Sequence, residues 1–302
     1  MVSPTHDIHT TLGALLVGLL ASCCLFGIST TQAYIYFSHF HKDRFYLKTL
    51  VVLVWSWELA HYVCLFYSFY FFAVVGYGNP NFLLNAPTAF NVAIGISGVI
   101  STLVQTFFAD RIRVLSEKLF IPVVCWTLSL VRLGTAFLTM SEAIKTPAVI
   151  PFAVEWKWLV VLTLAVGLAV DVTIAVSLSY YLKTKNKKLN PRTSFVVDRV
   201  TRWTIETGLL TSLTALAVLI CYVTMPRNFI WLGFYQVMAR VYSNSLLASL
   251  NGRRILRKSA EPDFNSGYSR ITRFGDGSTE ISVHVSTMTE VKFDPVFEYG
   301  VV

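Results

Sequence analysis

Charged residues are scarce in this chain, and that scarcity decides its class. Of the 302 residues, 14% are charged and 54% are hydrophobic, and the mean hydropathy is +0.58. Soluble domains carry about 25% charged residues, because their surfaces face water. The composition therefore excludes an ordinary soluble protein and predicts an integral membrane protein.

Several kinds of chemistry are missing as well. The chain has no Asn-x-Ser/Thr glycosylation acceptor, no phosphate-binding Gly-rich loop and no nucleophile elbow. Its cysteines all lie within hydrophobic runs, which predicts packing residues rather than extracellular disulfides. They are Cys23, Cys24, Cys64, Cys125 and Cys221. The sequence thus predicts neither an enzyme nor a bound cofactor.

Single residue types argue against two classes of membrane protein. A membrane zinc hydrolase needs about three His ligands at membrane depth, but only His61 of the six histidines lies within a hydrophobic run. A retinal protein needs a Lys in its last helix to form the Schiff base, and the last run contains Arg240 instead. No metal site is expected.

What the chain does contain is seven hydrophobic runs long enough to cross a bilayer. A helix of about 20 apolar residues spans the roughly 30 Å hydrocarbon core, where backbone groups must be hydrogen-bonded within the segment. The runs are residues 11–37, 47–75, 88–108, 119–140, 158–182, 203–223 and 229–250. They predict an all-α fold, a polytopic seven-helix transmembrane bundle with short connections.

The distribution of basic residues predicts the orientation of this bundle. Seventeen Lys and Arg side chains lie on one side and three on the other, and the side richer in Lys and Arg faces the cytoplasm. The N-terminus is therefore expected outside and the C-terminus inside. The first run has 27 uncharged residues with no basic residue before it, unlike a cleaved signal peptide. Without a C-terminal retention signal, the plasma membrane is the expected location.

The chain divides into three regions on this interpretation. Residues 1–10 are an extracellular N-terminus, 11–258 the seven-helix transmembrane domain, and 259–302 a disordered cytoplasmic tail. Within the tail, the alternating residues 281–285 are a candidate strand for pairing with a partner. The loop predicted at 183–202 carries seven basic residues, which favours the anionic inner leaflet of the lipid bilayer over nucleic acid. Loop and tail together are candidates for binding a cytoplasmic protein.

Ionisable residues inside the runs are the candidate functional residues. A charge at the centre of a membrane helix costs about 2.5 to 3.5 kcal/mol on insertion scales, so such residues usually serve a purpose. They are Glu58, His61, Arg132, Asp171 and Arg240. The acids and arginines lie at a similar depth, about 15 to 20 Å from the cytoplasmic ends of their helices. They predict a cavity for a ligand or ion, or else ion pairs that only fix helix register.

The depth and the topology also predict which charges meet. Runs 119–140 and 158–182 are consecutive and antiparallel, which favours an Arg132–Asp171 pair. Glu58 and Arg240 remain as the second pair. His61 follows Glu58 by three residues and therefore shares its helix face, which is expected to point into the bundle.

The topology invites comparison with G-protein-coupled receptors. Asp110, Arg111 and Ile112 stand at the cytoplasmic end of the third run, where those receptors carry Asp-Arg-Tyr. The proline kink of their sixth helix, the Asn-Pro-x-x-Tyr of their seventh and their extracellular disulfide are missing here. Lys and Arg are enriched at the cytoplasmic ends of membrane helices in general. The motif alone therefore does not predict a receptor switch.

Five stretches carry a resemblance to a known family. They are residues 11–37, Glu58-Leu59-Ala60-His61, and residues 171–182, 207–212 and 241–254. Together they resemble a large family of fungal, mainly basidiomycete, seven-helix membrane proteins that carry a domain of unknown function. The resemblance covers about residues 10–258, and its most specific part is the VYSNSLLASLN of residues 241–251.

This resemblance implies the seven-helix architecture but no activity. Two residues depart from the family pattern. Asp110 stands where the family has an aromatic residue, which argues further against the receptor switch. Glu206 stands where the family has Asn, so we expect it near the inner interface and outside any shared site.

Three functional classes remain open. The first is a receptor-like or sensory protein, in which a ligand from outside changes the midplane pairs and the basic loop and tail report the change. The second is a proton-coupled transporter that uses Glu58, His61 and Asp171, although no internal repeat or pair of matching broken helices supports it. The third is a non-catalytic membrane scaffold. The sequence favours the receptor-like class.

Overall fold

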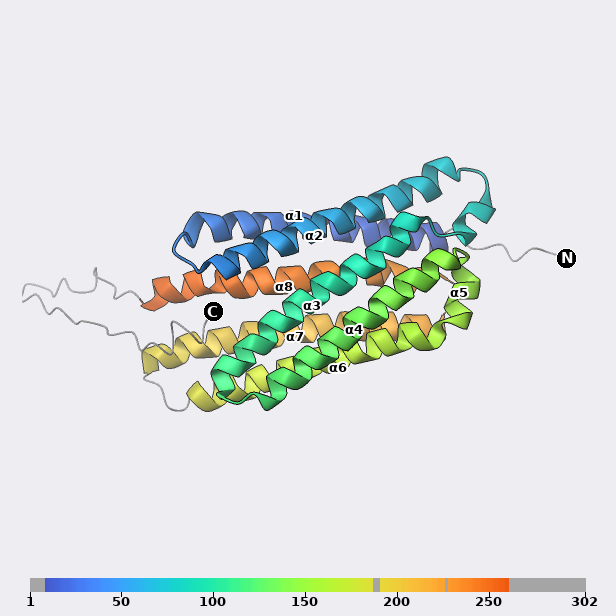
Figure 1. The fold of residues 1–302 in the computed structure, drawn as a ribbon. Helices are drawn as coiled ribbons and strands as arrows, with labels where there is room; N and C mark the ends of the chain where they lie inside the picture. Colours follow the sequence, from blue (N-terminus) through green and yellow to red (C-terminus); the bar gives the residue numbers. More distant parts are fainter. Residues whose placement is uncertain (1–8, 187–190, 226–227, 261–302) are drawn as a thin grey trace, which may run out of the picture.

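Seven long helices and one short helix make up the described part of the protein. The computed structural model describes residues 9–186, 191–225 and 228–260, and within these ranges it contains no strand. The helices, labelled as in Figure 1, are α1 (Ala14–His39), α2 (Phe45–Tyr70), α3 (Thr88–Ser116), α4 (Phe120–Lys145), α5 (Val149–Glu155), α6 (Lys157–Asn186), α7 (Pro191–Thr224) and α8 (Ile230–Ala260). Short π- and 3₁₀-helical turns are His9–Gly13, Phe71–Val75 and Pro80–Leu84.

Each predicted hydrophobic run falls on one of the seven long helices. Several helices continue past the predicted limits: α3 reaches Ser116, and α7 begins as early as Pro191. Hydropathy detects only the apolar part of a helix, so the predicted runs do not include the polar turns that continue it. The segment 183–202, predicted as a loop, is helical up to Asn186 and from Pro191 onward. Lysine is a good helix former and proline suits the first helical turn, which explains this difference.

Hydropathy also missed the short helix α5, because seven residues are too few to show a periodic pattern. An isolated antiparallel bridge between Asn85 and Ala148 ties the start of α5 to the α2–α3 connection. We call this extremity of the bundle the α5 end. The predicted extracellular N-terminus (1–10) and disordered tail (259–302) lie outside the described residues except at residues 9, 10, 259 and 260, which are helical. The candidate strand at 281–285 lies wholly outside them.

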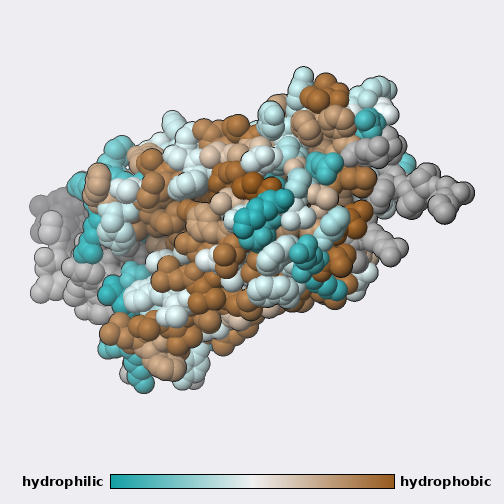
Figure 2. All heavy atoms as spheres, turned by 45° about the vertical axis from the view of Figure 1, so that its right-hand side comes forward, coloured by the Kyte–Doolittle hydropathy of each residue, from teal (hydrophilic) through white to brown (hydrophobic). Residues whose placement is uncertain are grey.

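Five helical stretches of the described chain are long and apolar enough to cross a membrane. They are His9–His39, Phe45–Val75, Thr88–Ser116, Phe120–Lys145 and Lys157–Thr184. In α7 the apolar stretch is shorter, Gly208–Thr224. Hydrophobic residues predominate in the middle of the face shown in Figure 2, with some polar residues among them. Large apolar side chains such as Leu20, Val63 and Leu213 are more than half exposed. A surface of this kind identifies a membrane-embedded protein.

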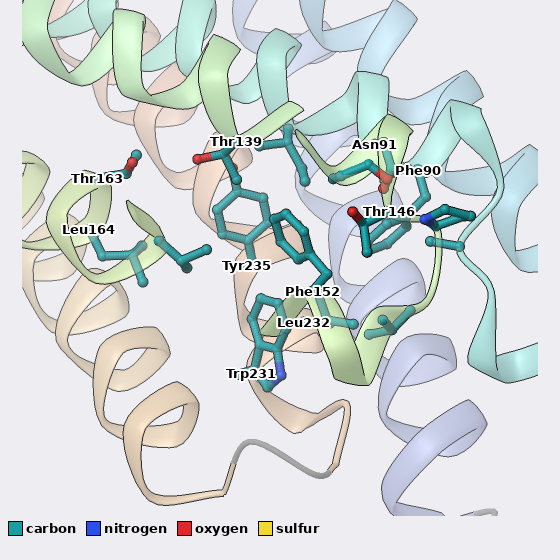
Figure 3. Close-up of a pocket in the computed structure, with 16 residues that line it drawn as sticks. Phe90, Asn91, Thr139, Thr146, Phe152, Thr163, Leu164, Trp231, Leu232 and Tyr235 are labelled. Atoms are coloured by element: carbon teal, nitrogen blue, oxygen red, sulfur yellow. Dashed lines mark hydrogen bonds between the residues drawn. The ribbon is translucent and has the colours of Figure 1, made fainter. Parts of the chain in front are cut away.

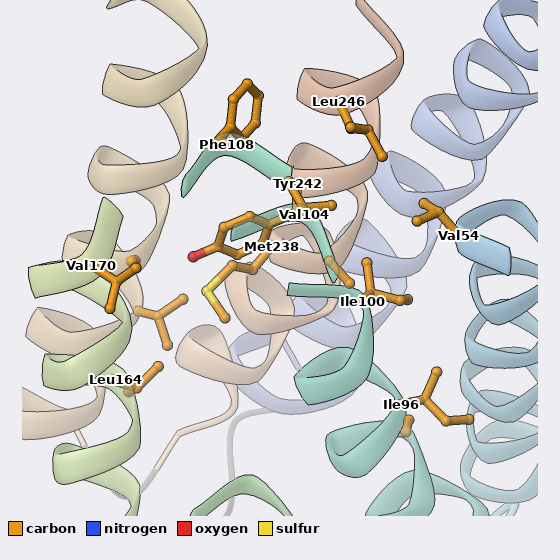
Figure 4. Packing of buried hydrophobic residues seen from close by; sticks show 14 of the residues in the cluster. Val54, Ile96, Ile100, Val104, Phe108, Leu164, Val170, Met238, Tyr242 and Leu246 are labelled. Carbon is orange, nitrogen blue, oxygen red and sulfur yellow. The ribbon is translucent and has the colours of Figure 1, made fainter. Parts of the chain in front are cut away.

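The most polar long helix, α8, is the most enclosed. It packs against α1, α2, α3 and α7, and Figure 1 shows it running between α1 and α2 on one side and α7 on the other. Figure 4 shows Met238 and Tyr242 of α8 pointing toward Val170 and Leu164 of α6. Because neighbouring helices surround α8, its polar side chains from Gln236 to Ser245 mostly meet protein rather than lipid.

Two glycines set the distance between α1 and α8. A Cβ atom added to Gly18 of α1 would lie 2.7 Å from the backbone oxygen of Gly233, and one added to Gly233 would lie 2.7 Å from the oxygen of Ala14. Real Cβ atoms do not approach backbone so closely. The two backbones therefore touch at this crossing, as in other small-residue contacts of membrane helices.

This contact predicts a difference between two glycines of the same helix. We expect Gly18→Ala to lower the stability by about 1 to 3 kcal/mol, because the new methyl group must push α8 away. Gly27→Ala is the matched control, since its Cβ would meet nothing within 4 Å and alanine favours the helix. Thermal unfolding of both variants in detergent measures the effect. Equal melting temperatures would contradict the close contact.

Candidate functional site

Two clusters of buried polar residues meet on α8. Arg240 and Tyr242 are two positions apart, so their side chains leave the helix in nearly opposite directions. Both are buried, with 0% and 2% of their surface exposed. Arg240 reaches toward α2, and Tyr242 reaches toward α4 and α6.

The first cluster joins Arg240 to both candidate residues of α2. The Nη1 atom of Arg240 lies 3.2 Å from Oε1 of Glu58 and donates a hydrogen bond of 2.9 Å to the Glu58 backbone oxygen. Its Nη2 atom lies 3.4 Å from Nδ1 of His61. Arginine has only donors, so Nδ1 accepts and the proton of a neutral His61 is on Nε2. The predicted Glu58–Arg240 pair and the shared face of Glu58 and His61 are confirmed.

Aromatic rings enclose this ion pair. The Arg240 guanidinium carbon lies 5.3 Å from the ring centroid of Phe26 and 5.9 Å from that of Tyr62, within cation–π distance. Phe26 and Tyr62 are themselves stacked, with centroids 5.6 Å apart. The charge therefore sits between a carboxylate and two ring faces, with no exposed surface of its own.

Some polar atoms of this cluster have no hydrogen-bond partner among the described residues. They are both carboxylate oxygens of Glu58, Nε2 of His61 and Nε of Arg240. The hydroxyls of Ser29 and Ser243 lie within reach of the Glu58 carboxylate and also of the backbone oxygens of Leu25 and Ala239, at 3.2 and 3.3 Å. Each hydroxyl has one proton, so it serves one of these acceptors at a time.

The second cluster links Arg132 to Asp171 through a tyrosine. Nη1 of Arg132 donates to the hydroxyl oxygen of Tyr242 at 3.0 Å, and that hydroxyl donates in turn to Oδ2 of Asp171. The predicted Arg132–Asp171 pair is therefore indirect. The two charges are on α4 and α6 as expected, but the α8 hydroxyl stands between them.

Two further residues complete the second cluster. Gln105 of α3 donates from Nε2 to Oδ1 of Asp171 at 2.8 Å and accepts from the Ser129 hydroxyl at 3.1 Å. On α6, a Cβ added to Gly167 would lie 2.8 Å from the guanidinium carbon of Arg132. The glycine thus makes room for the arginine one turn before Asp171. Four helices, α3, α4, α6 and α8, are tied together here.

A first pocket lies at the α5 end. It is lined by side chains of α3, α4, α5, α6 and α8, and its cavity volume is about 60 Å³. Figure 3 shows Phe152 of α5 close to Trp231 and Tyr235 of α8. The wall includes Tyr235 of α8. Tyr242 of the second cluster follows it by seven residues, about two helical turns, and lies on the same face of α8.

A second pocket has a cavity volume of about 30 Å³. Asp171, Gln105 and Tyr242 line it together with residues of α7, and it has room for about two water molecules. Of the five candidate residues, Asp171 lines this pocket, and neither pocket is lined by the other four. The ligand or ion cavity predicted around all five stays a prediction.

At the opposite end of the bundle, α8 is fastened to its neighbours by polar contacts. Arg253 forms an ion pair of 2.5 Å with Asp43, which also accepts from the Tyr36 hydroxyl at 3.0 Å. Asn251 donates to the backbone of α1, and Ser249 accepts from Arg111. We call these contacts the α8 clasp: Tyr36, Asp43, Arg111, Ser249, Asn251 and Arg253.

The clasp also explains the Asp-Arg-Ile motif. Arg111 is 3% exposed and reaches Ser249 at 2.9 Å, whereas Asp110 pairs with Arg113 at 2.7 Å. The acid and the arginine of the motif thus have separate partners. Arg111 serves as a contact between α3 and α8.

Sequence reasoning missed the uncharged members of the second cluster. It considered only ionisable residues, so Gln105, Ser129 and the Tyr242 hydroxyl were passed over. A signal existed for Gln105, because an amide in the middle of an apolar run must also find hydrogen bonds. Tyr242 gave a weaker signal, since tyrosines of membrane helices are concentrated at the interfaces, where their hydroxyls meet water.

Comparison with known proteins gives one family match. Residues 167–255 match a family of unknown function, DUF6534. The matched stretch runs from α6 through α8 and contains Asp171, Arg240 and Tyr242. No curated protein and no solved structure matches the chain.

The match confirms the coarse part of the predicted resemblance, namely the presence of a domain of unknown function. The stretches 171–182, 207–212 and 241–254 lie inside it, while Glu58, His61 and Arg132 lie outside. Fungal origin and a seven-span family architecture stay predictions.

The tyrosine bridge predicts a larger effect than an ordinary buried tyrosine. We expect Tyr242→Phe to cost about 1.5 to 3 kcal/mol, because hydrogen bonds to two charged partners are lost. Tyr222→Phe is the matched control: its buried hydroxyl donates to the neutral backbone oxygen of Ala153, so about 1 kcal/mol is expected. Protease resistance in membranes measures both. An equal loss would mean that the charges do not depend on the hydroxyl.

The first cluster predicts a double-mutant result. Arg240→Ala leaves the Glu58 charge buried without a counter-charge and should destabilise by about 3 to 5 kcal/mol. Adding Glu58→Ala to it should restore part of this loss, a coupling that a double-mutant cycle resolves. In the exposed Lys145–Glu142 pair, Lys145→Ala should cost less than about 1 kcal/mol. Additive losses at Arg240 and Glu58 would show that the two are energetically independent.

Proposed function

We propose that this protein is a receptor-like seven-helix membrane protein with its N-terminus outside, its C-terminus in the cytoplasm and the plasma membrane as its location. In this orientation the α5 end faces outward, because α5 and the start of α1 lie at the same end of the bundle (Figure 1). The excess of basic residues on the opposite side supports it. The α8 clasp then lies at the cytoplasmic face.

One observation carries the proposal: residues of α8 line the first pocket, belong to both buried clusters and form part of the α8 clasp. Near its start, Trp231 and Tyr235 line the first pocket. In its middle, Arg240 and Tyr242 belong to the two buried clusters. Near its end, Arg253 belongs to the clasp. A ligand in the pocket therefore contacts the same rigid element whose far end is held at the cytoplasmic side.

The buried clusters supply the two-state character that a sensor needs. Charges held at 0% to 5% exposure do not shift by small amounts, because partial separation of an ion pair in a low dielectric is costly. The clusters instead favour discrete arrangements of α8 against α2, α4 and α6. No catalytic step and no cofactor is part of the proposal.

A proton-coupled transporter is the second candidate, and one observation favours it. Glu58 and His61 are both fully buried and lie three residues apart on α2, and neighbouring carboxyl and imidazole groups at membrane depth are typical of proton relays. Against it, neither described pocket is lined by Glu58 or His61. A scaffold without a ligand would have no use for a pocket joined to the clusters.

Coupling along α8 can be tested without a ligand. We expect Trp231→Ala to loosen the start of α8 and to speed hydrogen exchange of backbone amides 245–253, at the clasp, by about fivefold or more, the lower end of typical allosteric couplings. Trp158→Ala is the control, because Trp158 is 60% exposed and lines neither pocket. Faster exchange confined to residues 228–238 would sink the receptor proposal, since α8 would not carry the change.

A further inference from the structure

Arg111 is a buried cation that the described part of the chain leaves without a counter-charge. It is 3% exposed, and its hydrogen bonding to described residues is limited to the bond from Nη1 to the Ser249 hydroxyl oxygen, at 2.9 Å. The preceding acid, Asp110, pairs with Arg113 instead, at 2.7 Å. The buried arginines of the two clusters, in contrast, each share their cluster with a carboxylate. A buried charge is costly unless an opposite charge accompanies it.

The charges on α1, α2 and α8 at this end of the bundle do not neutralise Arg111 either. Asp43 forms its ion pair with Arg253, at 2.5 Å. Arg253 follows Ser249 by four residues and therefore lies on the same face of α8. Its charge repels that of Arg111. The α8 clasp thus holds two arginines and one acid, and it has a net charge of about +1 at neutral pH.

Unused hydrogen-bond donors belong to the same residues. Nε of Arg111 is buried and has no partner among the described residues. Together with Nη2 it forms the edge of the guanidinium that binds an oxyanion through two parallel hydrogen bonds. The Ser249 hydroxyl accepts from Arg111, and its own proton goes to no described acceptor. Arg253 donates from Nε to the Leu250 backbone oxygen and from Nη2 to Asp43, which leaves Nη1 for another acceptor.

The number and charge of these donors select a phosphate group. A carboxylate has two oxygens, which a single guanidinium already satisfies, whereas a phosphate has more acceptor oxygens and suits donors from several side chains. The clasp offers such donors from α3 and from α8. It also lies at the surface, because the side chains of Asp43 and Arg253 keep 18% and 11% of their area exposed. An anion can therefore reach it from the end of the bundle.

We propose that the α8 clasp binds a phosphate group through Arg111, Ser249 and Arg253. The inference goes beyond the receptor proposal and shares with it only the orientation, which places the clasp at the cytoplasmic face. Arg111 supplies the two-bond grip, Ser249 a neutral donor and Arg253 a second charge. Asp43 keeps its ion pair with Arg253, so the phosphate adds to the clasp and replaces no partner.

The test uses inorganic phosphate as the probe and the purified full chain in detergent micelles. Calorimetric titration at constant ionic strength measures the Kd. We expect saturable binding that Arg111→Gln weakens by about tenfold or more, because hydrogen bonds between charged groups are lost. Arg113→Gln is the matched control: it removes the same charge two residues away, from a side chain that is 49% exposed. It should change the Kd by less than about threefold, as expected for an exposed charge.

A second variant and a second anion make the test specific. Arg111→Lys keeps the positive charge but lacks the planar fork, so it should fold and still bind phosphate more weakly than the wild type. It replaces Arg111→Gln if thermal unfolding shows that the glutamine variant is not folded. Acetate, a carboxylate of the same charge sign, should bind at least about tenfold more weakly than phosphate.

The source of the phosphate is distinguished in lipid nanodiscs. Phosphatidylcholine discs with and without phosphatidic acid are titrated with inorganic phosphate. If phosphatidic acid raises the apparent Kd of inorganic phosphate in the wild type and leaves it unchanged in Arg111→Lys, a lipid head group occupies the clasp. An unchanged Kd in the wild type identifies a soluble phosphate compound. Either result supports the site.

The remaining outcomes decide against it. Absence of saturable phosphate binding, or an equal loss in Arg111→Gln and Arg113→Gln, overturns the site. Equal affinity for acetate overturns the phosphate class. The receptor proposal is tested separately, by hydrogen exchange in Trp231→Ala, so each of the two can fail while the other stands.

Discussion

A buried arginine is the constraint on which the rest of this bundle depends. Arg240 has no exposed surface, and a guanidinium cannot shed its charge, so the fold has to supply partners for it. Glu58, His61 and two aromatic rings do so, and they come from α1 and α2. Docking of α1 and α2 onto α8 is thus fixed in register by one residue. Misplacing either helix by a turn would strand a charge in a medium without water.

The second cluster does the same for the other half of the bundle. Arg132 and Asp171 lie on α4 and α6, and the Tyr242 hydroxyl lets them share a charge-assisted chain rather than a single pair. Gln105 brings α3 into the chain. Since Arg240 and Tyr242 are only two residues apart, the two halves of the molecule are tied to one turn of α8.

The sequence predicted helices well and contacts less completely, for physical reasons. Lipid leaves the backbone little choice but helix, so each hydrophobic run maps onto a long helix. The Glu58–Arg240 pair followed from charge and depth alone. The role of Tyr242 could not be predicted in this way, because the presence of a tyrosine does not show whether its hydroxyl faces a carboxylate or the membrane interface. The pocket was equally hidden: its walls come from five helices, and a cavity is what side chains leave unfilled, which no single segment encodes.

The glycine contact with α1 fixes α8 at one point, about which α8 can tilt. Gly233 sits between Leu232 and Tyr235, so the pinned point and the pocket wall are the same turn of α8. Arg253 lies twenty residues further on, about 30 Å along the axis at 1.5 Å per residue. On a lever of that length, a tilt of about 5° displaces the far end by about 2.6 Å, the size of a hydrogen-bond length. The same tilt displaces Arg240, seven residues from Gly233, by about 0.9 Å. Separation of Arg253 from Asp43 is therefore tied to a rearrangement of the buried charges, which resist small displacements.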